Sequence, residues 1–480
     1  MKNNRSHFKL IIILFVVCTH FISACNKLDE EPIGLVSPET YFNSASQAES
    51  VLVSATGELW QIWNDYSYGW QYFNHDDQLD GGNLNISYTH AEELWSAHWS
   101  SLLNINTLLK AVNAGRIKNA TQAEIDLIVG QAKFLRGYNY FMLVRMYGGV
   151  PLYTDKIDDP ALNPLPRASV AEVYNLIVSD FQEAAAKLPN QWSADKKGRP
   201  SSGAAKGLLA KTYLTMATAP LNDASNYAKA ATVAKEIIDA GIHSLTPNIE
   251  DVFLLQNKYS SEMMWSFNSN YEDLSTDAQI WAPSEWSGWG DYPVDPLWES
   301  VWPDQPRKKA YLVTEIDGVN YKNWENKKPA VRKFLIPNIS EDDLLNSAAT
   351  YNCPIIRFAD VLLIYAEAAN MANNGPTQAA CDAINKVIDR ANGHVINPLH
   401  PRFTTAMTQK AFDDGVIEER SWELCFEFDR WFDLVRKRIL KDKSPRYVAN
   451  FSDADYLFPI PEKDLRLNKL LIQNPGYATP

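Results

Sequence analysis

The sequence lacks the short motifs that mark common catalytic sites, and it has no cluster of basic residues. No GxSxG, HExxH, GxxxxGKS/T, GxGxxG or paired CxxC pattern occurs, so the usual hydrolase, metalloprotease and nucleotide-binding classes find no support. The formal net charge is −13, with no Lys/Arg block. Binding to nucleic acid needs a basic surface, so we exclude nucleic acid as a partner.

Cysteine is also scarce. Two of the five cysteines, Cys18 and Cys25, lie in the N-terminal segment, which leaves Cys353, Cys381 and Cys425 widely spaced along the chain. This odd number shows neither a disulfide framework nor the spacing of a zinc site. We therefore expect three buried free thiols and no resident metal or cofactor.

The N-terminus carries the one long apolar run. A basic segment, MKNNRSHFK, precedes LIIILFVVC, which is too short to cross a bilayer as a mature helix and is typical of an export signal. The signal ends in ISAC, the pattern of a bacterial lipoprotein signal, although a plain secretory signal with a chance cysteine is the alternative. We predict a signal peptide at 1–24, lipidation of Cys25 and a lipidated tether at 25–43.

Helical periodicity dominates the rest of the chain, and clear strand alternation is rare. Thr121 and Glu124 form a capping-box pattern before a helix that Gly148 ends. Further helices are predicted at about 44–63, 168–187, 202–218, 223–240, 357–373, 376–391 and 411–438.

Two helical segments also resemble each other. AKFLRGYNYF (132–141) and AKGLLAKTYL (205–214) are offset by about two units of roughly 34 residues, the tetratricopeptide period. We predict a mainly α fold, with a tetratricopeptide-like scaffold of helix pairs in a single domain at 44–480. An irregular, aromatic-rich insertion at about 244–350 is expected to form the ligand face.

Carboxylates in the segment EERSWELCFEFDRWFDLVRKR could suggest a glycosidase. Glu419, Glu423 and Glu427 recur every four residues and would line one helix face. Arg420, Arg430 and Arg436 lie on the same predicted helix, so we expect structural ion pairs. His90 and His98 are about two helical turns apart, too far for joint metal binding.

Tryptophan is the informative residue, because ten of the fifteen fall in two short windows. Aromatic faces stack on the C–H faces of sugar rings, while nearby Asp and Asn bind hydroxyl groups. We expect Trp60, Trp95 and Trp99 to be core residues, and Trp298 to be either core or exposed. The candidate ligand-binding residues are Trp70, Tyr72, Asp76, Asp77 and Asn83 in the first window, and Trp281, Trp286, Trp289 and Tyr292 in the second.

Segments along nearly the whole chain resemble one known family. They follow in order: ISAC (22–25), AKFLRGYNYFMLVRMYGGVPLYT (132–154), RASVAEVYNLIVSDFQEAAAKLP (167–189), GRPSSGAAKGLLAKTYLTMA (198–217), RFADVLLIYAEAAN (357–370), IEERSWELCFEFDRWFDLVR (417–436), LFPIPEKDL (457–465) and QNPGY (473–477). Together they are similar to the SusD/RagB family of outer-membrane nutrient-binding lipoproteins of Bacteroidota. These are scaffold motifs, so no ligand-binding residue is carried over.

The resemblance implies a function without catalysis. It implies four tetratricopeptide-like helix pairs in a lipoprotein anchored to the cell outer membrane and facing outward. Such proteins capture oligosaccharides and pass them to a SusC-like, TonB-dependent transporter. In the RagB branch the ligand is a peptide, and the sequence leaves that alternative open.

Overall fold

The computed structural model describes residues 41–64, 89–156, 164–269, 278–335, 350–443 and 451–479. Within the chain, Phe42–Pro480 form one compact unit. Several predictions lie outside the described residues: the signal peptide, the lipidated Cys25, most of the tether, and the candidates Trp70, Tyr72, Asp76, Asp77 and Asn83.

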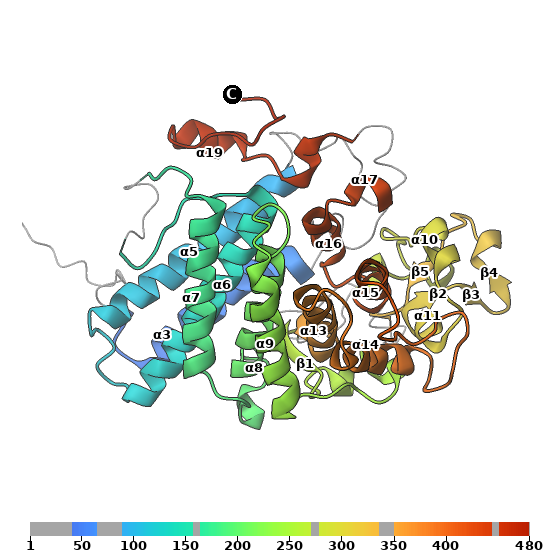
Figure 1. The fold of residues 1–480 in the computed structure, drawn as a ribbon. Coiled ribbons are helices and arrows are strands. Elements are labelled where there is room, and N and C mark those ends of the chain that lie inside the picture. Colours follow the sequence, from blue (N-terminus) through green and yellow to red (C-terminus); the bar gives the residue numbers. More distant parts are fainter. Residues whose placement is uncertain are drawn as a thin grey trace, which may run out of the picture. The chain divides into compact units, whose positions relative to one another are not determined.

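Helices build the larger part of this unit (Figure 1). The first six are α3 (Ala45–Asn64), α5 (Thr89–Asn113), α6 (Gln122–Tyr147), α7 (Val170–Lys187), α8 (Ser202–Met216) and α9 (Ser225–Ala240). The C-terminal part adds α13 (Phe358–Ala372), α14 (Gln378–Ala391), α15 (Gln409–Glu423), α16 (Arg430–Lys437), α17 (Leu440–Lys443) and α19 (Glu462–Leu467). The prediction of a mainly α fold is confirmed.

Each long helix packs against the next one in the chain, from α3 to α9. Helix α9 then packs against α13, although more than 110 residues separate the two. The chain therefore leaves the helical scaffold after α9 and returns to it at α13, which continues the stack through α14 and α15.

Helix α6 illustrates how local sequence sets these elements. The Thr121 hydroxyl accepts from the Glu124 amide at 3.3 Å, and the Glu124 carboxylate accepts from the Thr121 amide at 2.7 Å. The predicted capping box is thus confirmed. Gly148, with φ at +76°, ends the helix. Gly137 faces the Phe181 ring, where an added Cβ would lie 3.0 Å from a ring carbon, so α6 and α7 approach closely.

One predicted helix is wrong. The segment at 411–438 contains two helices, because α15 ends at Glu423 and α16 begins at Arg430. Phe426 and Phe428 between them have φ values of +62° and +65°. The Lys333 ammonium donates to the backbone oxygens of Glu423 and Cys425 at 3.0 and 2.8 Å, and so satisfies carbonyl groups released at this break.

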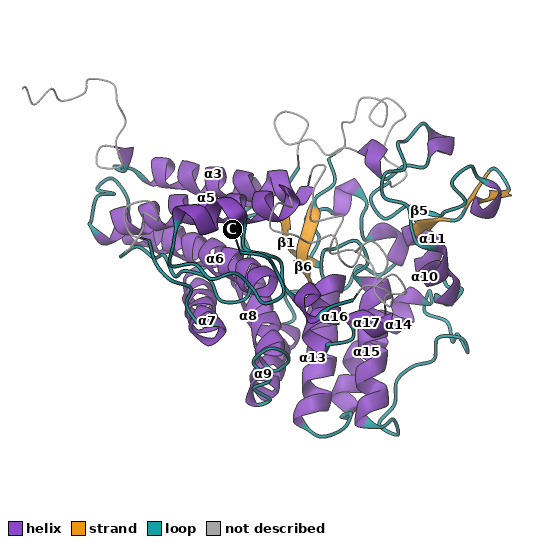
Figure 2. Cartoon of the chain, turned by 90° about the horizontal axis from the view of Figure 1, so that it is seen from above, coloured by secondary structure: helices purple, strands orange, loops and turns teal. Residues whose placement is uncertain are grey.

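The segment between α9 and α13 contains short elements and little regular structure (Figure 2). Its helical turns are η2 (Ile249–Asp251), η3 (Leu255–Asn257), η4 (Ala278–Ile280), η5 (Ser284–Trp286), α10 (Pro296–Val301), α11 (Pro306–Tyr311) and η6 (Tyr321–Asn323). Its strands are β1 (Met263–Phe267), β2 (Leu312–Val313), β3 (Glu315–Ile316), β4 (Val319–Asn320), β5 (Ala330–Val331) and β6 (Cys353–Arg357).

These strands form three two-stranded antiparallel sheets, β1–β6, β2–β5 and β3–β4. The first sheet pairs Phe267 with Cys353 and contacts α8, which fastens the insertion to the scaffold. A small core of Val313, Tyr321, Trp324 and Ala330 supports the other two.

Polar groups in the core agree with the sequence expectations. Cys353, Cys381 and Cys425 are buried free thiols, as predicted. His98 is fully buried, its Nδ1 lies 2.8 Å from the Asn139 side-chain oxygen, and burial lowers its pKa to about 4.

In the part of the chain that the structure describes, no helix is both long enough and apolar enough to span a membrane.

Candidate functional site

The tryptophan-rich segment at 278–295 folds back on itself. The Trp289 amide donates to the Gln279 oxygen at 2.8 Å, and the Gly290 amide donates to the Ala282 oxygen at 2.9 Å. A tight turn, η5, forms the tip between these two legs. A Cβ on Gly288 would lie 2.1 Å from the Ala282 oxygen, so only glycine permits this close approach.

Two of the predicted ligand-binding aromatics anchor this loop and face away from solvent. Trp281 and Tyr292 are 1% and 6% exposed, and their rings contact each other at 5.0 Å. The Trp281 indole N–H donates to the Tyr351 hydroxyl at 2.7 Å, and its ring packs on Phe334. The expectation that Trp281 and Tyr292 stack on a ligand is therefore corrected, because neither ring presents a face to solvent.

The other two aromatics lie at the tip of the loop. Trp286 is 37% exposed and Trp289 is 47% exposed. Ser287, between them, has φ at +61°, and the Gly288 amide donates to the Pro283 oxygen at 3.1 Å. The loop thus presents two large, partly exposed aromatic side chains on a backbone fixed by hydrogen bonds, which is a suitable platform for stacking on a ligand.

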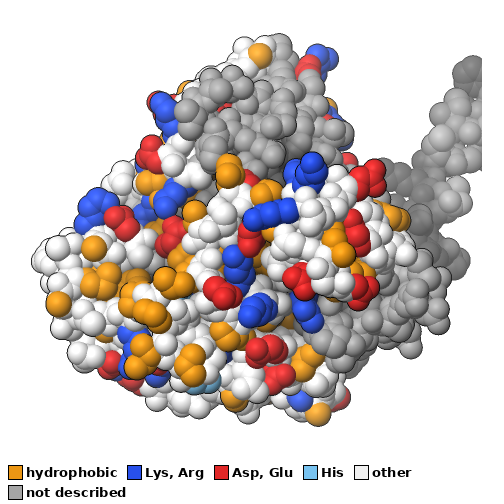
Figure 3. Space-filling model, turned by 90° about the vertical axis from the view of Figure 1, so that its right-hand side faces the viewer, with side chains coloured by type: hydrophobic (Ala, Val, Ile, Leu, Met, Phe, Trp, Pro, Cys, Tyr) orange, Lys and Arg blue, Asp and Glu red, His pale blue; other side chains and the backbone are white. Residues whose placement is uncertain are grey.

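The surroundings of this platform carry groups of both charges. Glu285 and Asp291 flank the two tryptophans in the sequence and are exposed. Lys327 is exposed in the neighbouring segment, where the Val294 amide donates to the Pro329 oxygen. On the face drawn in Figure 3, acidic and basic side chains alternate with small groups of hydrophobic ones. Such a surface has no strong field of one sign and suits a neutral ligand.

The tryptophans expected in the core differ in their exposure. Trp298 and Trp302 are buried and pack against Phe426 and Trp422, so Trp298 belongs to the core. Trp60 and Trp95 are buried as expected. Trp99 was also expected in the core but is partly exposed, and its ring packs on Tyr140 and Tyr153.

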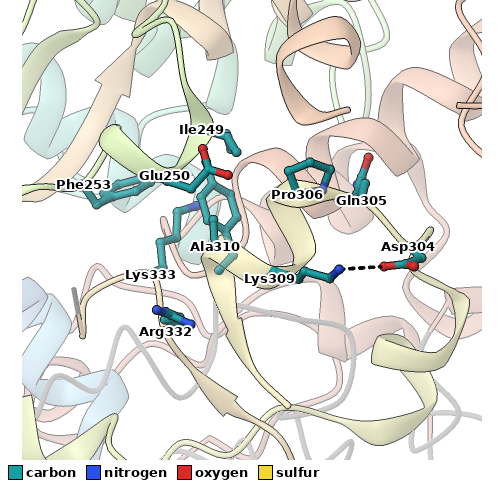
Figure 4. Close-up of a pocket in the computed structure, with 11 residues that line it drawn as sticks. Ile249, Glu250, Phe253, Asp304, Gln305, Pro306, Lys309, Ala310, Arg332 and Lys333 are labelled. Carbon is teal, nitrogen blue, oxygen red and sulfur yellow. Dashed lines mark ion pairs between the residues drawn. The ribbon is translucent and has the colours of Figure 1, made fainter. Parts of the chain in front are cut away.

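A second candidate site is a cavity of about 510 Å³ between η2 and α11. Figure 4 shows Glu250 and Phe253 on one wall and Asp304 and Lys309 along another. Arg332 and Lys333 come from the segment directly after β5. Lys309 lies 4.0 Å from Asp304, and both side chains are largely exposed. The cavity therefore offers carboxylates and cationic groups near an aromatic ring. No sequence pattern pointed to it, because its walls come from distant segments.

The carboxylates considered for glycosidase chemistry lie in a buried ion-pair network. Arg307 binds Glu419 and Glu423 at 2.6 and 2.9 Å, and Arg357 binds Glu423 at 2.7 Å. Burial raises the pKa of Glu419 and of Glu423, but the positive charge of the surrounding arginines lowers it by more. Both pKa values therefore lie below the usual value. A general acid needs a raised pKa, so these groups are structural.

The ion pairs themselves differ from the prediction. The partners of Glu419 and Glu423 come from distant segments and not from Arg420, Arg430 or Arg436 on the predicted helix. Arg420 binds Asp360 and Asp433, and Arg436 binds Glu367. The distances among the described residues reveal no cluster of His, Cys, Asp or Glu suited to a metal ion.

Comparison with known proteins identifies the fold. A family model described as the SusD family matches residues 258–477, and a second model, described as "Starch-binding associating with outer membrane", matches residues 17–214. The chain belongs to the SusD-like family. The resemblance seen in the sequence is thus confirmed. One model matches the N-terminal part of this SusD-like protein and the other matches its C-terminal part.

Relatives cover almost the full length of the SusD-like chain. It is 25% identical to SusD-like protein P25 of Formosa agariphila, over 98% of this chain and 99% of the relative. A SusD homolog from Bacteroides thetaiotaomicron superposes with a TM-score of 0.75 at 23% identity, covering 92% of this chain and 98% of that chain. A laminarin-binding SusD-like protein superposes at 0.73 and 21% identity, covering 91% of this chain and 100% of that chain.

Proposed function

We propose that this protein is a non-enzymatic, surface glycan-binding lipoprotein that stacks oligosaccharides on Trp286 and Trp289. The observation that carries the proposal is the exposure of these two rings on a loop that Trp281 anchors in the core. The face of an aromatic ring is electron-rich and attracts the weakly positive C–H groups of a sugar ring. The exposed Glu285 and Asp291 carboxylates beside the rings would accept hydrogen bonds from sugar hydroxyls.

The relatives support a carbohydrate ligand. One matching family model is described as starch-binding, and one similar structure is of a laminarin-binding protein. Both ligands are neutral glucans, which agrees with the mixed charge around the aromatic platform. We extend the same ligand class, neutral oligosaccharides, to this chain.

The cellular setting of the proposal rests on the sequence and on the family. The ISAC segment supports lipidation of Cys25, and the description of one matching family supports association with the outer membrane. We propose that the protein faces the cell exterior and passes captured oligosaccharides to a SusC-like, TonB-dependent transporter.

The glycan platform is tested by replacing both exposed rings. We expect W286A/W289A to weaken oligosaccharide binding by roughly 10- to 100-fold, since each aromatic contact contributes about 0.5–1.5 kcal/mol. Binding is measured by screening the full chain on an oligosaccharide array and titrating the best ligand by calorimetry.

A control variant removes two exposed apolar side chains from the adjacent helix α10. Leu297 and Val301 are 65% and 64% exposed, so L297A/V301A should leave both binding and the free energy of unfolding unchanged. Glycan binding by W286A/W289A at the affinity of the unmodified protein would refute the assignment of the platform.

Peptide binding, as in a RagB-like nutrient-uptake protein, is the second candidate function. The cavity between η2 and α11 favours it, because Glu250 and Asp304 could bind an amino group while Lys309 and Arg332 bind a carboxylate. A mixed peptide library offered to the same full chain separates the two functions. Retention of peptides that K309A/R332A no longer retains, without any array signal, would favour the peptide ligand.

A further inference from the structure

Two further cavities, distinct from the aromatic platform, adjoin the turn at Lys197–Arg199. One measures about 310 Å³ and the other about 570 Å³. Both are lined by the turn itself and by Trp265 and Asn268. They share no residue with the loop that carries Trp286 and Trp289.

The turn between the cavities is held in place from both sides. Gly198 has φ at +91°, and a Cβ there would lie 2.5 Å from the Asn268 amide nitrogen. That same nitrogen donates to the Gly198 oxygen at 3.1 Å. Arg199 donates twice to the Glu49 carboxylate, at 2.8 and 3.3 Å. The wall shared by the two cavities is therefore preorganised.

The smaller cavity combines aromatic rings with uncharged polar groups. The Trp192 indole N–H donates to the Pro200 oxygen at 2.9 Å, and Arg199 lies 5.5 Å from the centre of its ring. Tyr259 is 38% exposed at the same cavity. Asn190 and Gln191 contribute amides, and the buried Ser260 hydroxyl has no hydrogen-bond partner among the described residues.

The larger cavity is lined by a buried hydrogen-bond donor, the Trp60 indole N–H. Trp60 is only 6% exposed, and its indole N–H has no hydrogen-bond partner in the described part of the chain. An indole nitrogen can only donate, and an unmet buried donor is unusual in a folded protein. A ligand oxygen in this cavity would satisfy it. Gln131 and Trp265 line the same space.

This region carries few unpaired charges. Arg199 and Glu49 neutralise each other, which leaves Lys197 and Glu58 at the larger cavity and Lys258 at the smaller one. Hydroxyl, amide and indole groups are therefore the main recognition elements. This chemistry matches a neutral polyhydroxylated chain better than a peptide with charged termini.

We propose that the two cavities form one groove that binds neighbouring sugar units of a neutral oligosaccharide, as a second binding site of the protein. Trp192 and Tyr259 would stack on one unit, and the Trp60 indole would donate to a hydroxyl of another. The ligand class rests on the proposed function, whereas the position of the groove rests on the geometry of the Lys197–Arg199 turn.

The groove is tested by calorimetric titration of the full chain with laminarihexaose, maltoheptaose and the best oligosaccharide from the array. W192A/Y259A removes both stacking rings, and W60F removes the indole N–H and part of the indole while keeping an aromatic ring. We expect two sets of sites in the unmodified protein. W192A/Y259A should lose one set, whereas W60F should weaken it roughly 2- to 10-fold.

The platform variant W286A/W289A separates the two proposals. If the groove exists, W286A/W289A keeps the set of sites that W192A/Y259A lacks. A single set of sites that W286A/W289A abolishes and W60F leaves unchanged overturns the groove but supports the platform. Absence of any glycan binding, or loss of peptide binding in W192A/Y259A, overturns the groove as well. If W192A/Y259A does not fold, the calorimetric titration of W60F alone tests the groove.

Discussion

Trp281 shows how one side chain can support a site without touching its ligand. It is almost fully buried between Tyr292 and Phe334, and it donates a hydrogen bond to Tyr351. Tyr351 lies 70 positions away in the sequence, and Phe334 lies 53 away. The role of Trp281 is to fix the base of the loop whose tip presents Trp286 and Trp289.

Replacing Trp281 therefore tests the anchor separately from the platform. We expect W281A to lower the free energy of unfolding by about 3–5 kcal/mol, because it empties a large buried volume and leaves Tyr351 without its donor. W286A should cost clearly less than W281A, since 37% of that side chain is exposed and its removal opens no enclosed cavity. Urea denaturation of both variants measures the difference, and equal losses would contradict the assignment of anchor and tip.

At the scale of elements, local patterns predicted most of the helices. The capping box at Thr121 and the helical periodicity of α7, α8, α9, α13 and α14 predicted boundaries within about two residues of those observed, because caps and amphipathic faces are encoded in adjacent residues. The break between α15 and α16 could not be predicted this way. Its carbonyl groups are satisfied by Lys333, which lies 90 positions earlier in the chain.

The candidate site was also predicted only in part, because contacts with distant segments decide which of its side chains are exposed. The composition of the 281–298 segment pointed to an aromatic surface, but four tryptophans in an irregular loop look alike in a sequence. Which of them are buried depends on Phe334, Tyr351 and Phe426, whose positions are set by the tertiary fold. The cavities at η2 and at the Lys197–Arg199 turn join distant segments and left no local pattern.

Replacing Lys333 tests the break between α15 and α16. It also binds Glu427 at 2.5 Å and is 1% exposed. We expect K333M to lower the free energy of unfolding by about 2–4 kcal/mol and to speed amide exchange around residues 423–430. The Cys425 carbonyl loses its donor, and the Glu427 carboxylate and the Glu423 carbonyl keep only Arg357 as donor. K309M removes an exposed lysine and is the control. Equal exchange in the two variants would show that Lys333 does not hold the break.

At the scale of the whole unit, buried charges join segments that are far apart in the sequence. Glu423 on α15 binds Arg307 from the insertion, Arg357 from β6 and Arg390 from α14. Arg357 and Arg390 also bind Glu262, next to β1. The carboxylate therefore fastens the irregular insertion, with its aromatic platform, to the helical scaffold. Buried networks of this kind tolerate poorly the loss of a single member.

Removing the charge of Glu423 tests this role and its pH dependence. The three arginines hold the Glu423 pKa below its usual 4.5, so its contribution is full above about pH 4.5 and is lost as the pH falls toward the folded-state value. E423Q should therefore cost about 3–5 kcal/mol at pH 7, and the unmodified protein should approach it in stability as acid is added. Urea titrations at pH 7, 5 and 3 measure both curves. A stability difference that stays constant down to pH 3 would mean that the ionised carboxylate does not hold these segments together.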